Sequence, residues 1–429
     1  MISGKQTIAG ELSPAELQEV VEATIAALPA PLRKVLLIHP DYSRHDFTDL
    51  IAGMIYRALE KKGLEQLDTL NASGTHREMT PEELTKKLGL APETHPRLGR
   101  LFNHQFDDPA QLVHVVDIPA GFVSEKTGGH LQQPLAVMTN RLMTDNYDAV
   151  LAVSGTVPHE GTGYSGGTKI FFPGISGPEV IGLFHWAAVL IGIPKIIGTM
   201  DNAARDVVNE GAAHIFRLLG ERPVVSFNMV YSEGEGHRIL PKGLFTGVGL
   251  EGFKEALQAA AKLSSKVHIV YTDEPKQVIV QQIPAMYDEV WSAGKGSYKL
   301  QKSGVLAEGG EIILYAPHIH CFHSNKKMDA AIRQIGYHGR DYVVRYCEKH
   351  PDFDKNVASH VINVRGLGRL VGEREEFSFK VTLATQIPEA ECKAANLGYR
   401  SPGSLREKDF QGSGKLWIRE GGQWLYARK

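Results

Sequence analysis

The sequence is poor in cysteine, in surplus charge and in long apolar runs. Its 429 residues include only 3 cysteines, at 321, 347 and 392, and none of them forms a C-x-x-C pair. This spacing argues against a disulfide framework and a structural zinc site, and it favours a reducing compartment, which we expect to be the cytoplasm. Lys and Arg number 47 against 49 Asp and Glu, so the charge balance does not indicate nucleic acid or an anionic membrane as a partner. No apolar run reaches spanning length and the first residues lack the apolar segment of a signal peptide, so we expect no membrane association.

What the sequence does contain is a repeated order of strand, polar loop and helix. The length predicts two or three domains. The order occurs three times in the first half, which is typical of an α/β fold with a doubly wound sheet. The predicted strands cover residues 34–38, 64–70 and 147–154, and the predicted helices cover residues 14–28 and 47–62 and begin again near 80 and 178.

The pattern restarts after Ser264-Ser265-Lys266, where we place a domain boundary. The sequence therefore predicts an N-terminal α/β domain over residues 1–266 and a C-terminal α/β domain over residues 267–429. In the second domain, a helix is expected over residues 286–302, and the tail is expected to form a hairpin around Gly421-Gly422.

A glycine-rich loop lies between the strand at 147–154 and the helix that begins near Pro178. Its glycines at 161, 163, 166 and 167 permit positive φ and a close approach of backbone N–H groups to an anion, and Lys169 follows them. The loop is not a Walker motif, because Ile170 rather than Ser or Thr follows the lysine. It is not a dinucleotide-binding turn either, because no helix is expected to start within it. The pattern indicates a phosphate-bearing ligand beside a lysine, with a flexible surface loop as the alternative.

Polar side chains follow the predicted strands at their carboxyl ends, where doubly wound sheets bind ligands. They are Asp41, Arg44, His76, His159 and Lys169. Two loop histidines could act as acid and base on opposite faces of a substrate, but each could equally cap a helix or bind a carbonyl. Arg44 could bind a carboxylate or form a surface ion pair. Lys169 could be a point charge for phosphate or a covalent lysine.

Further histidines lie outside these loops. His185 is expected in mid-helix, where a lone histidine is usually a core residue, and no second histidine at helical spacing makes it a metal pair. His318, His320 and His323 are spaced like a metal cluster, although polar contacts to a substrate explain them as well.

These motifs together resemble the nickel-dependent lactate racemase family of 2-hydroxy acid racemases and epimerases. Asp41-Tyr42-Ser43-Arg44 is similar to the family's D-x-[ST]-R loop, and Gly74-Thr75-His76-Arg77 to its G-T-H-R segment. The order of His159, Ser165-Gly166-Gly167-Thr168-Lys169, the Pro173–Gly177 segment and His185 also follows the family. The resemblance covers most of the chain, and it implies two α/β domains with the active site in the crevice between them.

The resemblance implies a cofactor, the nickel pincer nucleotide. This group is a pyridinium-3-thioamide-5-thiocarboxylic acid mononucleotide that is tethered to a lysine and holds nickel with one protein histidine. By resemblance Lys169 is the tether, Gly166 and Gly167 belong to the cofactor-binding segment, and His185 is the nickel ligand. Separate cofactor-biosynthesis enzymes make the group, so they are implied partners.

The resemblance also implies the roles of the strand-end residues. His76 and His159 would be the acid/base pair, acting while the α-hydride moves from substrate to cofactor and a planar 2-keto acid forms. Arg44 would hold the substrate carboxylate, and Asp41 would support the cofactor and its metal ligand.

The C-terminal domain is implied to close over the substrate. Lys295 matches a family lysine near the substrate, whereas Ser292 stands where lactate-using members have a glutamine. We therefore expect a 2-hydroxy acid that is larger or more polar than lactate, such as a sugar acid epimerised at C2. His318 and His320 would add polar contacts to its further hydroxyl groups.

Two other classes of function remain open from the residues. A nucleotide-phosphate-binding transferase would use Lys169 as a point charge, without nickel. A cofactor carrier would keep the fold without turnover. It would need neither His76 nor His159, so the presence of both histidines argues against this class.

Overall fold

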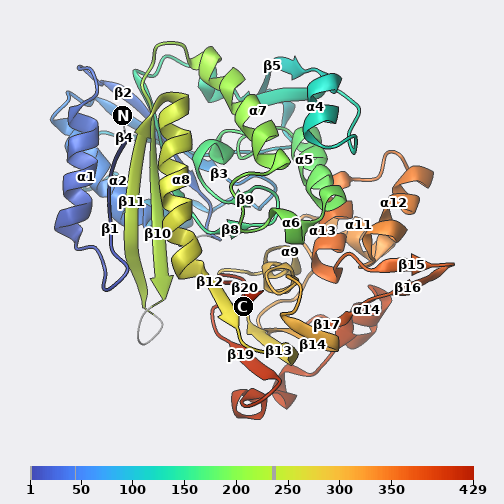
Figure 1. Ribbon diagram of the computed structural model, residues 1–429. Coiled ribbons are helices and arrows are strands. Elements are labelled where there is room, and N and C mark those ends of the chain that lie inside the picture. Colours follow the sequence, from blue (N-terminus) through green and yellow to red (C-terminus); the bar gives the residue numbers. More distant parts are fainter. Residues whose placement is uncertain (1, 44, 234–237) are drawn as a thin grey trace. The chain divides into compact units, whose positions relative to one another are not determined.

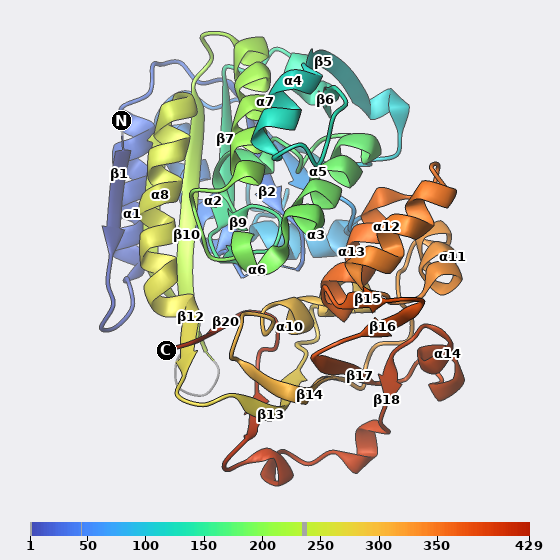
Figure 2. The ribbon, with the colours of Figure 1, turned by 45° about the vertical axis from the view of Figure 1, so that its right-hand side comes forward.

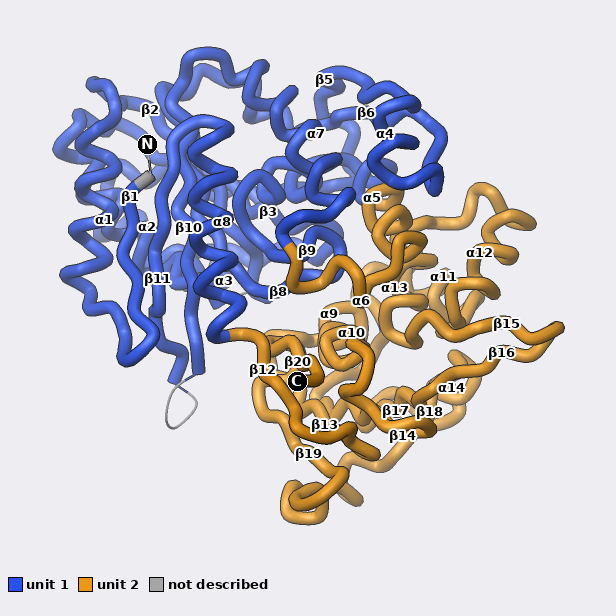
Figure 3. Tube along the Cα trace, in the orientation of Figure 1, with its two compact units in different colours: residues 1–181, 200–267 blue, residues 182–199, 268–429 orange. Residues whose placement is uncertain are grey.

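The computed structural model describes residues 2–43, 45–233 and 238–429. Arg44, the predicted carboxylate ligand, lies outside the described residues. The chain divides into two compact units, one of residues 1–181 and 200–267 and one of residues 182–199 and 268–429 (Figure 3). The sequence predicted a change of domain at 266/267 but did not anticipate that residues 182–199 group with the second unit. No helix in the described ranges is both long enough and apolar enough to cross a bilayer.

Unit 1 is built on a seven-stranded sheet of order β1-β11-β10-β7-β2-β3-β4. Its five strands from β10 to β4 are parallel, whereas β11 is antiparallel to β10 and β1 antiparallel to β11. The sheet is doubly wound as predicted, with an antiparallel edge that the sequence pattern did not indicate. The strands are β1 (Ile2–Gln6), β2 (Lys34–Pro40), β3 (Gln66–Ala72), β4 (Leu98–Asn103), β7 (Ala149–Gly155), β10 (Val224–Glu233) and β11 (Ile239–Val248).

Helices cover both faces of this sheet. Ser13 and Thr80 form capping boxes with Glu16 and Glu83, which fix the starts of two helices where the sequence predicts them. Figures 1 and 2 show α1 and α8 on opposite sides of β1, β11 and β10. The helices are α1 (Pro14–Ala26), α2 (Thr48–Glu60), α3 (Pro81–Leu88), α4 (Ala120–Lys126), α7 (Ala203–Leu219) and α8 (Gly249–His268).

The alternation of side chains along the strands divides the core of unit 1 in two. Met229 and Leu244 pack with α1 and α2, whereas their neighbours Val230 and Phe245 pack with α8. This alternation is what a sheet buried on both faces requires.

Two smaller sheets accompany the main one. The strand predicted at 113–118 is β5 (Leu112–Ile118), but it pairs antiparallel with β6 (Leu135–Asn140) and lies outside the main sheet. In the glycine-rich loop, β8 (Pro158–His159) pairs with β9 (Gly163–Tyr164) and is followed by a 3-10 helix, η3 (Gly167–Ile170).

Unit 2 is built on a five-stranded parallel sheet of order β18-β17-β14-β13-β19. A separate parallel pair joins β12 to β20, and β15 and β16 form a separate antiparallel pair. The strands are β12 (Ile269–Thr272), β13 (Lys276–Gln282), β14 (Leu306–Ala316), β15 (Arg369–Val371), β16 (Arg374–Glu376), β17 (Phe379–Thr385), β18 (Gly398–Tyr399), β19 (Lys415–Ile418) and β20 (Leu425–Arg428).

The helices of unit 2 are mostly short. They are α6 (Ile193–Ile196), α9 (Val290–Ala293), α10 (Lys295–Tyr298), α11 (Lys326–Ile335), α12 (Arg340–Lys349), α13 (Lys355–Arg365) and α14 (Glu389–Ala394). One further helix, α5 (Pro178–Ile191), begins in unit 1 and continues into unit 2.

Two predictions for unit 2 were wrong. The helix expected over residues 286–302 is two short helices that meet at Gly294, where an added Cβ would lie 2.6 Å from Val364 Cγ2. The tail is not a hairpin, because β19 pairs with β13 and β20 pairs with β12. Both partners are more than a hundred residues away in the sequence, so the local pattern of the tail could not indicate them.

Candidate functional site

The strand order of unit 1 places a topological switch point between β2 and β7. From β2 the chain moves outward through β3 and β4, and it returns on the other side of β2 as β7 and β10. Crossover loops therefore leave in opposite directions at the carboxyl ends of β2 and β7, which is where open α/β sheets bind ligands. These two ends carry Asp41 and the His159–Lys169 loop, and the adjacent end of β3 carries His76.

The loops at this edge contact one another directly. Gly74 N donates to Gly174 O at 3.2 Å, which joins the His76 loop to the segment after Lys169. At Gly155, an added Cβ would lie 2.9 Å from His45 O, so the end of β7 lies against the loop after β2. The structure thus brings the predicted strand-end loops of unit 1 together.

Asp41 and His76 form the first pair at this edge. Asp41 Oδ1 accepts hydrogen bonds from Ser43 N at 3.0 Å and from Ser43 Oγ at 2.7 Å. The other carboxylate oxygen, Oδ2, lies 3.4 Å from His76 Nδ1, with both side chains largely buried. The Ser43 contacts orient the carboxylate, so that Oδ2 lies on the side of the imidazole.

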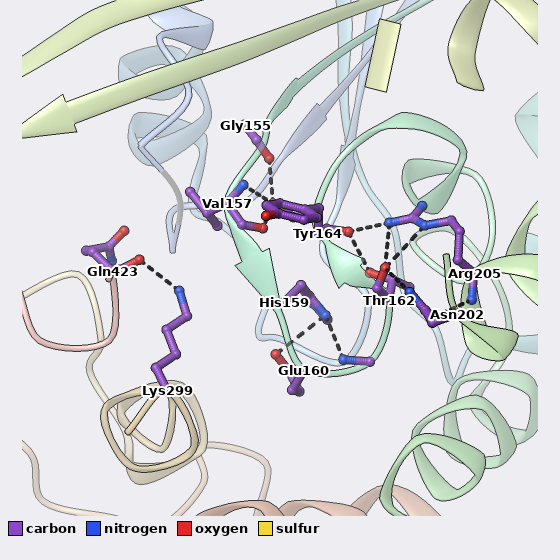
Figure 4. Close-up of polar contacts among 12 residues, drawn as sticks. Gly155, Val157, His159, Glu160, Thr162, Tyr164, Asn202, Arg205, Lys299 and Gln423 are labelled. Atoms are coloured by element: carbon purple, nitrogen blue, oxygen red, sulfur yellow. Dashed lines mark hydrogen bonds and ion pairs between the residues drawn. The ribbon is translucent and has the colours of Figure 1, made fainter. Parts of the chain in front are cut away.

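His159 is the second buried histidine of the edge. Its Nδ1 accepts a hydrogen bond from Gly161 N at 3.0 Å, and Glu160 Oε2 lies 3.4 Å from the same nitrogen (Figure 4). The β8–β9 pair places His159 opposite Gly163, whose φ is 78°. The short strands β8 and β9, which flank a tight turn, therefore hold the imidazole ring of His159 in place.

The glycines before Lys169 serve the loop's own packing. Gly166 has a φ of 86°, and an added Cβ would lie 3.0 Å from Ser154 Oγ and from Thr156 Oγ1. Gly167 has a φ of 60°, and its N–H donates to Asn228 Oδ1 at 3.0 Å. The Gly161 and Gly167 amides thus donate to groups of the chain itself, rather than only to an anion as the pattern suggested.

Arg205 on α7 binds the glycine-rich loop, and no motif in the sequence indicated this contact. Its Nη2 donates to Thr162 O at 3.2 Å and also to Tyr164 O (Figure 4). Asn202, the N-cap residue of α7, donates to Thr162 O at 3.4 Å. Arg205 is 3% exposed, and this burial lowers the pKa of its guanidinium to about 9, so the group is still charged at neutral pH.

His185, the predicted nickel ligand, lies on the part of α5 that belongs to unit 2. Its Nδ1 lies 3.2 Å from Asn356 Oδ1, and Asn356 is held at the start of α13 by Asp354 Oδ1. An amide oxygen only accepts, so Nδ1 carries the proton and Nε2 keeps its lone pair. Within the described ranges, no three His, Cys, Asp or Glu side chains gather as a metal site.

Lys295 belongs to a buried polar group that follows β13 in unit 2. Its Nζ lies 4.4 Å from the centre of the Tyr287 ring, and Gln423 Nε2 donates to the Tyr287 hydroxyl. Lys299, one turn further along, donates to Gln423 O at 2.9 Å (Figure 4). The Lys295 side chain is therefore positioned by the chain between β19 and β20 as well as by its own segment.

The sequence singled out four further residues of unit 2, and their environments differ from one another. Ser292 is fully buried, and its hydroxyl donates to Glu289 O at 3.0 Å. His318 Nε2 donates to Tyr287 O at 2.9 Å, whereas His320 is exposed. His323 is buried, and its Nδ1 accepts from Asn325 N at 2.9 Å. The three histidines of this loop thus have three separate environments and do not form a cluster.

Trp291 lies between two buried histidines of unit 2. Its ring centre is 4.3 Å from that of His360 and 4.9 Å from that of His323. Burial lowers the pKa of His323 to about 4 and that of His360 to about 3, so both rings are neutral at physiological pH.

Two solved structures have this α/β architecture. A crystal structure of a protein from Thermotoga maritima is 50% identical, with a TM-score of 0.94, and the match covers 99% of this chain and 100% of that chain. The lactate racemase apoprotein from Thermoanaerobacterium thermosaccharolyticum has the same fold at 16% identity and a TM-score of 0.64, covering 98% of this chain and 95% of that one. Comparison with curated proteins gives no match.

The fold and the strand-end histidines define a two-unit α/β protein with a polar edge at the switch point of its first sheet. Residues 11–193 match the lactate racemase N-terminal domain. Over these residues, which make up less than half of the chain, it is a homologue of the lactate racemase family.

Proposed function

We propose that this protein is a racemase or epimerase of 2-hydroxy acids that carries a nickel pincer nucleotide on Lys169. The match of residues 11–193 to the lactate racemase N-terminal domain supports the class of reaction. The observation that carries the cofactor assignment is the His185–Asn356 hydrogen bond at 3.2 Å, since it leaves Nε2 as a lone-pair donor. A neutral imidazole whose other nitrogen donates to an oxygen is the usual state of a metal-ligating histidine.

The residues of the chain fit such a group. His185 would supply the single protein ligand to nickel, oriented by Asn356. Lys169, half-buried in η3 directly after Gly166 and Gly167, would supply the tether. When bound, the group supplies a reversible acceptor for the α-hydride of the substrate.

The chain's own residues would handle the proton and the carboxylate. His76, beside Asp41, and His159 would be the acid/base pair: one accepts the proton of the substrate hydroxyl, and the other can serve the opposite enantiomer. Arg44 and Lys295 are the proposed cationic partners of the substrate.

The substrate is proposed to be larger or more polar than lactate. Ser292 is small and its hydroxyl donates to Glu289 O, so this position would leave room where a glutamine side chain would fill it. His318 and the exposed His320 would add polar contacts, and a sugar acid epimerised at C2 fits these features.

The first experiment is intact-protein mass together with nickel content, on protein produced with the cofactor-biosynthesis enzymes. The wild type should gain the mass of the modified nucleotide, with nickel near one per chain. Lys169→Arg is the matched control, because arginine keeps the charge but cannot form the tether. A wild type that stays unmodified despite those enzymes would contradict the cofactor assignment and favour the phosphate-binding transferase. Binding of ATP would then identify that alternative.

The second experiment compares substrates on the loaded protein. Loss of optical activity should be faster with aldonic acids than with lactate. Racemisation of lactate much faster than any aldonic acid would refute the proposed substrate class but not the cofactor.

A further inference from the structure

His104, which directly follows the edge strand β4, uses both nitrogens of its ring. Its Nε2 lies 2.9 Å from Ser176 O, and because a carbonyl oxygen only accepts, Nε2 carries the proton and donates. Its Nδ1 lies 3.0 Å from Asn140 Nδ2, while Asn140 Oδ1 accepts from Leu142 N at 3.1 Å. The neutral ring with its proton on Nε2 therefore satisfies both contacts. His104 is 1% exposed, so water does not compete for either nitrogen.

The backbone of the same residue contacts the His76 loop. Ser73 Oγ donates to His104 O at 2.8 Å, and Ser73 is buried as well. Ser73 O in turn accepts from His76 N at 3.0 Å, which closes the turn that carries His76. One residue thus binds this turn through its carbonyl oxygen and the stretch beyond Lys169 through its ring.

A direct hydrogen bond between these two segments lies beside the contacts of His104. Gly74 N, next to Ser73, donates to Gly174 O at 3.2 Å. The N–H of Gly174 donates to Lys169 O at 3.0 Å, so the position of Gly174 is coupled to that of Lys169 through the backbone. The ring of His104 adds a second connection two residues further along, at Ser176.

The β5–β6 pair, which lies outside the main sheet, supports the ring of His104. Asn140 ends β6, and its Nδ2 lies 3.3 Å from Gln111 Oε1 as well as 3.0 Å from His104 Nδ1. Gln111 Nε2 donates to Gln105 Oε1, so this chain of amides returns to the residue after His104. The ring is therefore held on both sides, and the small sheet acquires a role toward the candidate site.

From these contacts we infer that His104 is a positioning residue of the candidate site. It holds the turn of His76, by way of Ser73, and the stretch that follows Lys169, by way of Ser176, at a fixed separation. Because it is buried, it acts through these two segments and not by contact with a substrate. Its effect on turnover rests on the proposed function, whereas its effect on the two segments does not.

Two substitutions separate the hydrogen bonds of His104 from the bulk of its side chain. His104→Gln keeps an N–H donor for Ser176 O, whereas His104→Leu keeps bulk but has no donor. Val137→Ala is the matched control, because Val137 is fully buried on β6 and its truncation destabilises the protein without removing a side-chain hydrogen bond. Ser73→Ala is the second variant if His104→Leu does not fold, since it removes only the hydroxyl donor to His104 O.

Site-resolved hydrogen exchange on the chain without cofactor is the first measurement. The amides of Gly74 and His76 should exchange about 3-fold to 10-fold faster in His104→Leu than in wild type, as for the loss of one ordinary hydrogen bond. Both amides should stay within about 2-fold of wild type in His104→Gln. They should also do so in Val137→Ala although its melting temperature falls, because loop amides exchange by local opening and not by global unfolding.

Turnover of the loaded protein is the second measurement, expressed per chain that carries the cofactor by intact mass. His104→Leu should lower kcat about 10-fold to 100-fold and keep KM within about 3-fold, since it misaligns reacting groups without removing a group that binds substrate. Ser73→Ala should lower kcat by about 2-fold to 10-fold. His104→Gln should recover kcat to within about 3-fold of wild type, and Val137→Ala should leave it unchanged.

Each outcome decides a stated claim. The positioning role is overturned if the Gly74 amide exchanges no faster in His104→Leu, or in Ser73→Ala where the former does not fold. It is also overturned if His104→Gln or Val137→Ala loses as much kcat as His104→Leu. If loaded wild type turns over no 2-hydroxy acid, the proposed function fails instead, and the exchange of the two amides still decides whether His104 couples the two segments.

Discussion

Arg205 shows how much one buried side chain contributes to the candidate site. Its guanidinium donates to the carbonyl oxygens of Thr162 and Tyr164, so it fixes the turn that carries His159. Arg205→Met keeps much of the apolar contact but leaves both carbonyls without this donor. We expect a loss of roughly 1.5–3 kcal/mol in the free energy of unfolding, as for the loss of hydrogen bonds from a charged group, because each carbonyl keeps one other donor, Asn202 or the Thr162 hydroxyl. Thermal unfolding measures the effect.

Arg217 provides the control on the same helix. Its side chain is 63% exposed, so Arg217→Met should change stability by less than about 0.5 kcal/mol. Equal shifts of the melting temperature in the two variants would contradict the role assigned to Arg205.

At the residue scale, the sequence indicated which residues follow a strand but not which distant residues contact them. Asp41, His76 and His159 lie at one edge of the first sheet because the carboxyl ends of parallel strands meet there, and their roles stay predictions. Arg205 and Asn356 were missed, since they act on residues 43 and 171 positions away. The hydrophobic pattern of a helix does not show which of its polar side chains makes a hydrogen bond to a distant segment.

At the scale of elements, the glycine-rich loop is held by close packing as well as by backbone conformation. Gly167 has a φ of 60°, and an added Cβ would lie 2.8 Å from Leu257 Cδ2 on α8. Gly167→Ala should therefore cost about 1–2 kcal/mol for the left-handed backbone and about 1–3 kcal/mol more for overpacking. Chemical denaturation of the variant tests this sum.

Gly128 separates the two contributions. Its φ is 62°, but nothing lies within 4 Å of an added Cβ, so Gly128→Ala carries the backbone cost alone. If both alanine variants lose the same free energy of unfolding, the Leu257 side chain moves aside without destabilising the protein, and the packing argument is wrong.

Element boundaries were predictable wherever a local signal exists. The capping boxes at Ser13 and Thr80 fix the starts of α1 and α3 where the sequence predicts them. The tail had no such signal, because β19 and β20 are strands only through pairing with β13 and β12. Strand partners set by topology are not encoded in the nearby residues.

At the scale of the whole molecule, acid should destabilise both units. Burial lowers the pKa of His39 and His104 in unit 1 from 6.5 to about 4, as it does for His323 in unit 2. Below pH 6.5 the unfolded chain binds protons that the folded chain does not, so stability falls as the pH decreases from about 6.5 toward 4. Melting temperatures measured across this window should decrease steadily toward acid.

His104→Gln is the informative variant for this prediction. Glutamine can keep the donor to Ser176 O, which His104 Nε2 contacts at 2.9 Å, but it does not titrate. Its melting temperature should depend less steeply on pH than that of the wild type. An unchanged slope would mean that His104 does not contribute to the acid sensitivity.

The grouping of residues 182–199 with unit 2 has a consequence for how the polypeptide can be divided. Gly198 packs on Leu425, and Asn356 contacts His185, so this segment needs parts of the chain that are synthesised much later. A fragment that stops near residue 266 would contain all of unit 1 but would expose the apolar part of α5 to water. On the ribosome, that stretch must likewise remain uncovered until α13 and β20 emerge. The units are therefore compact in space but not separable by a single cut in the gene.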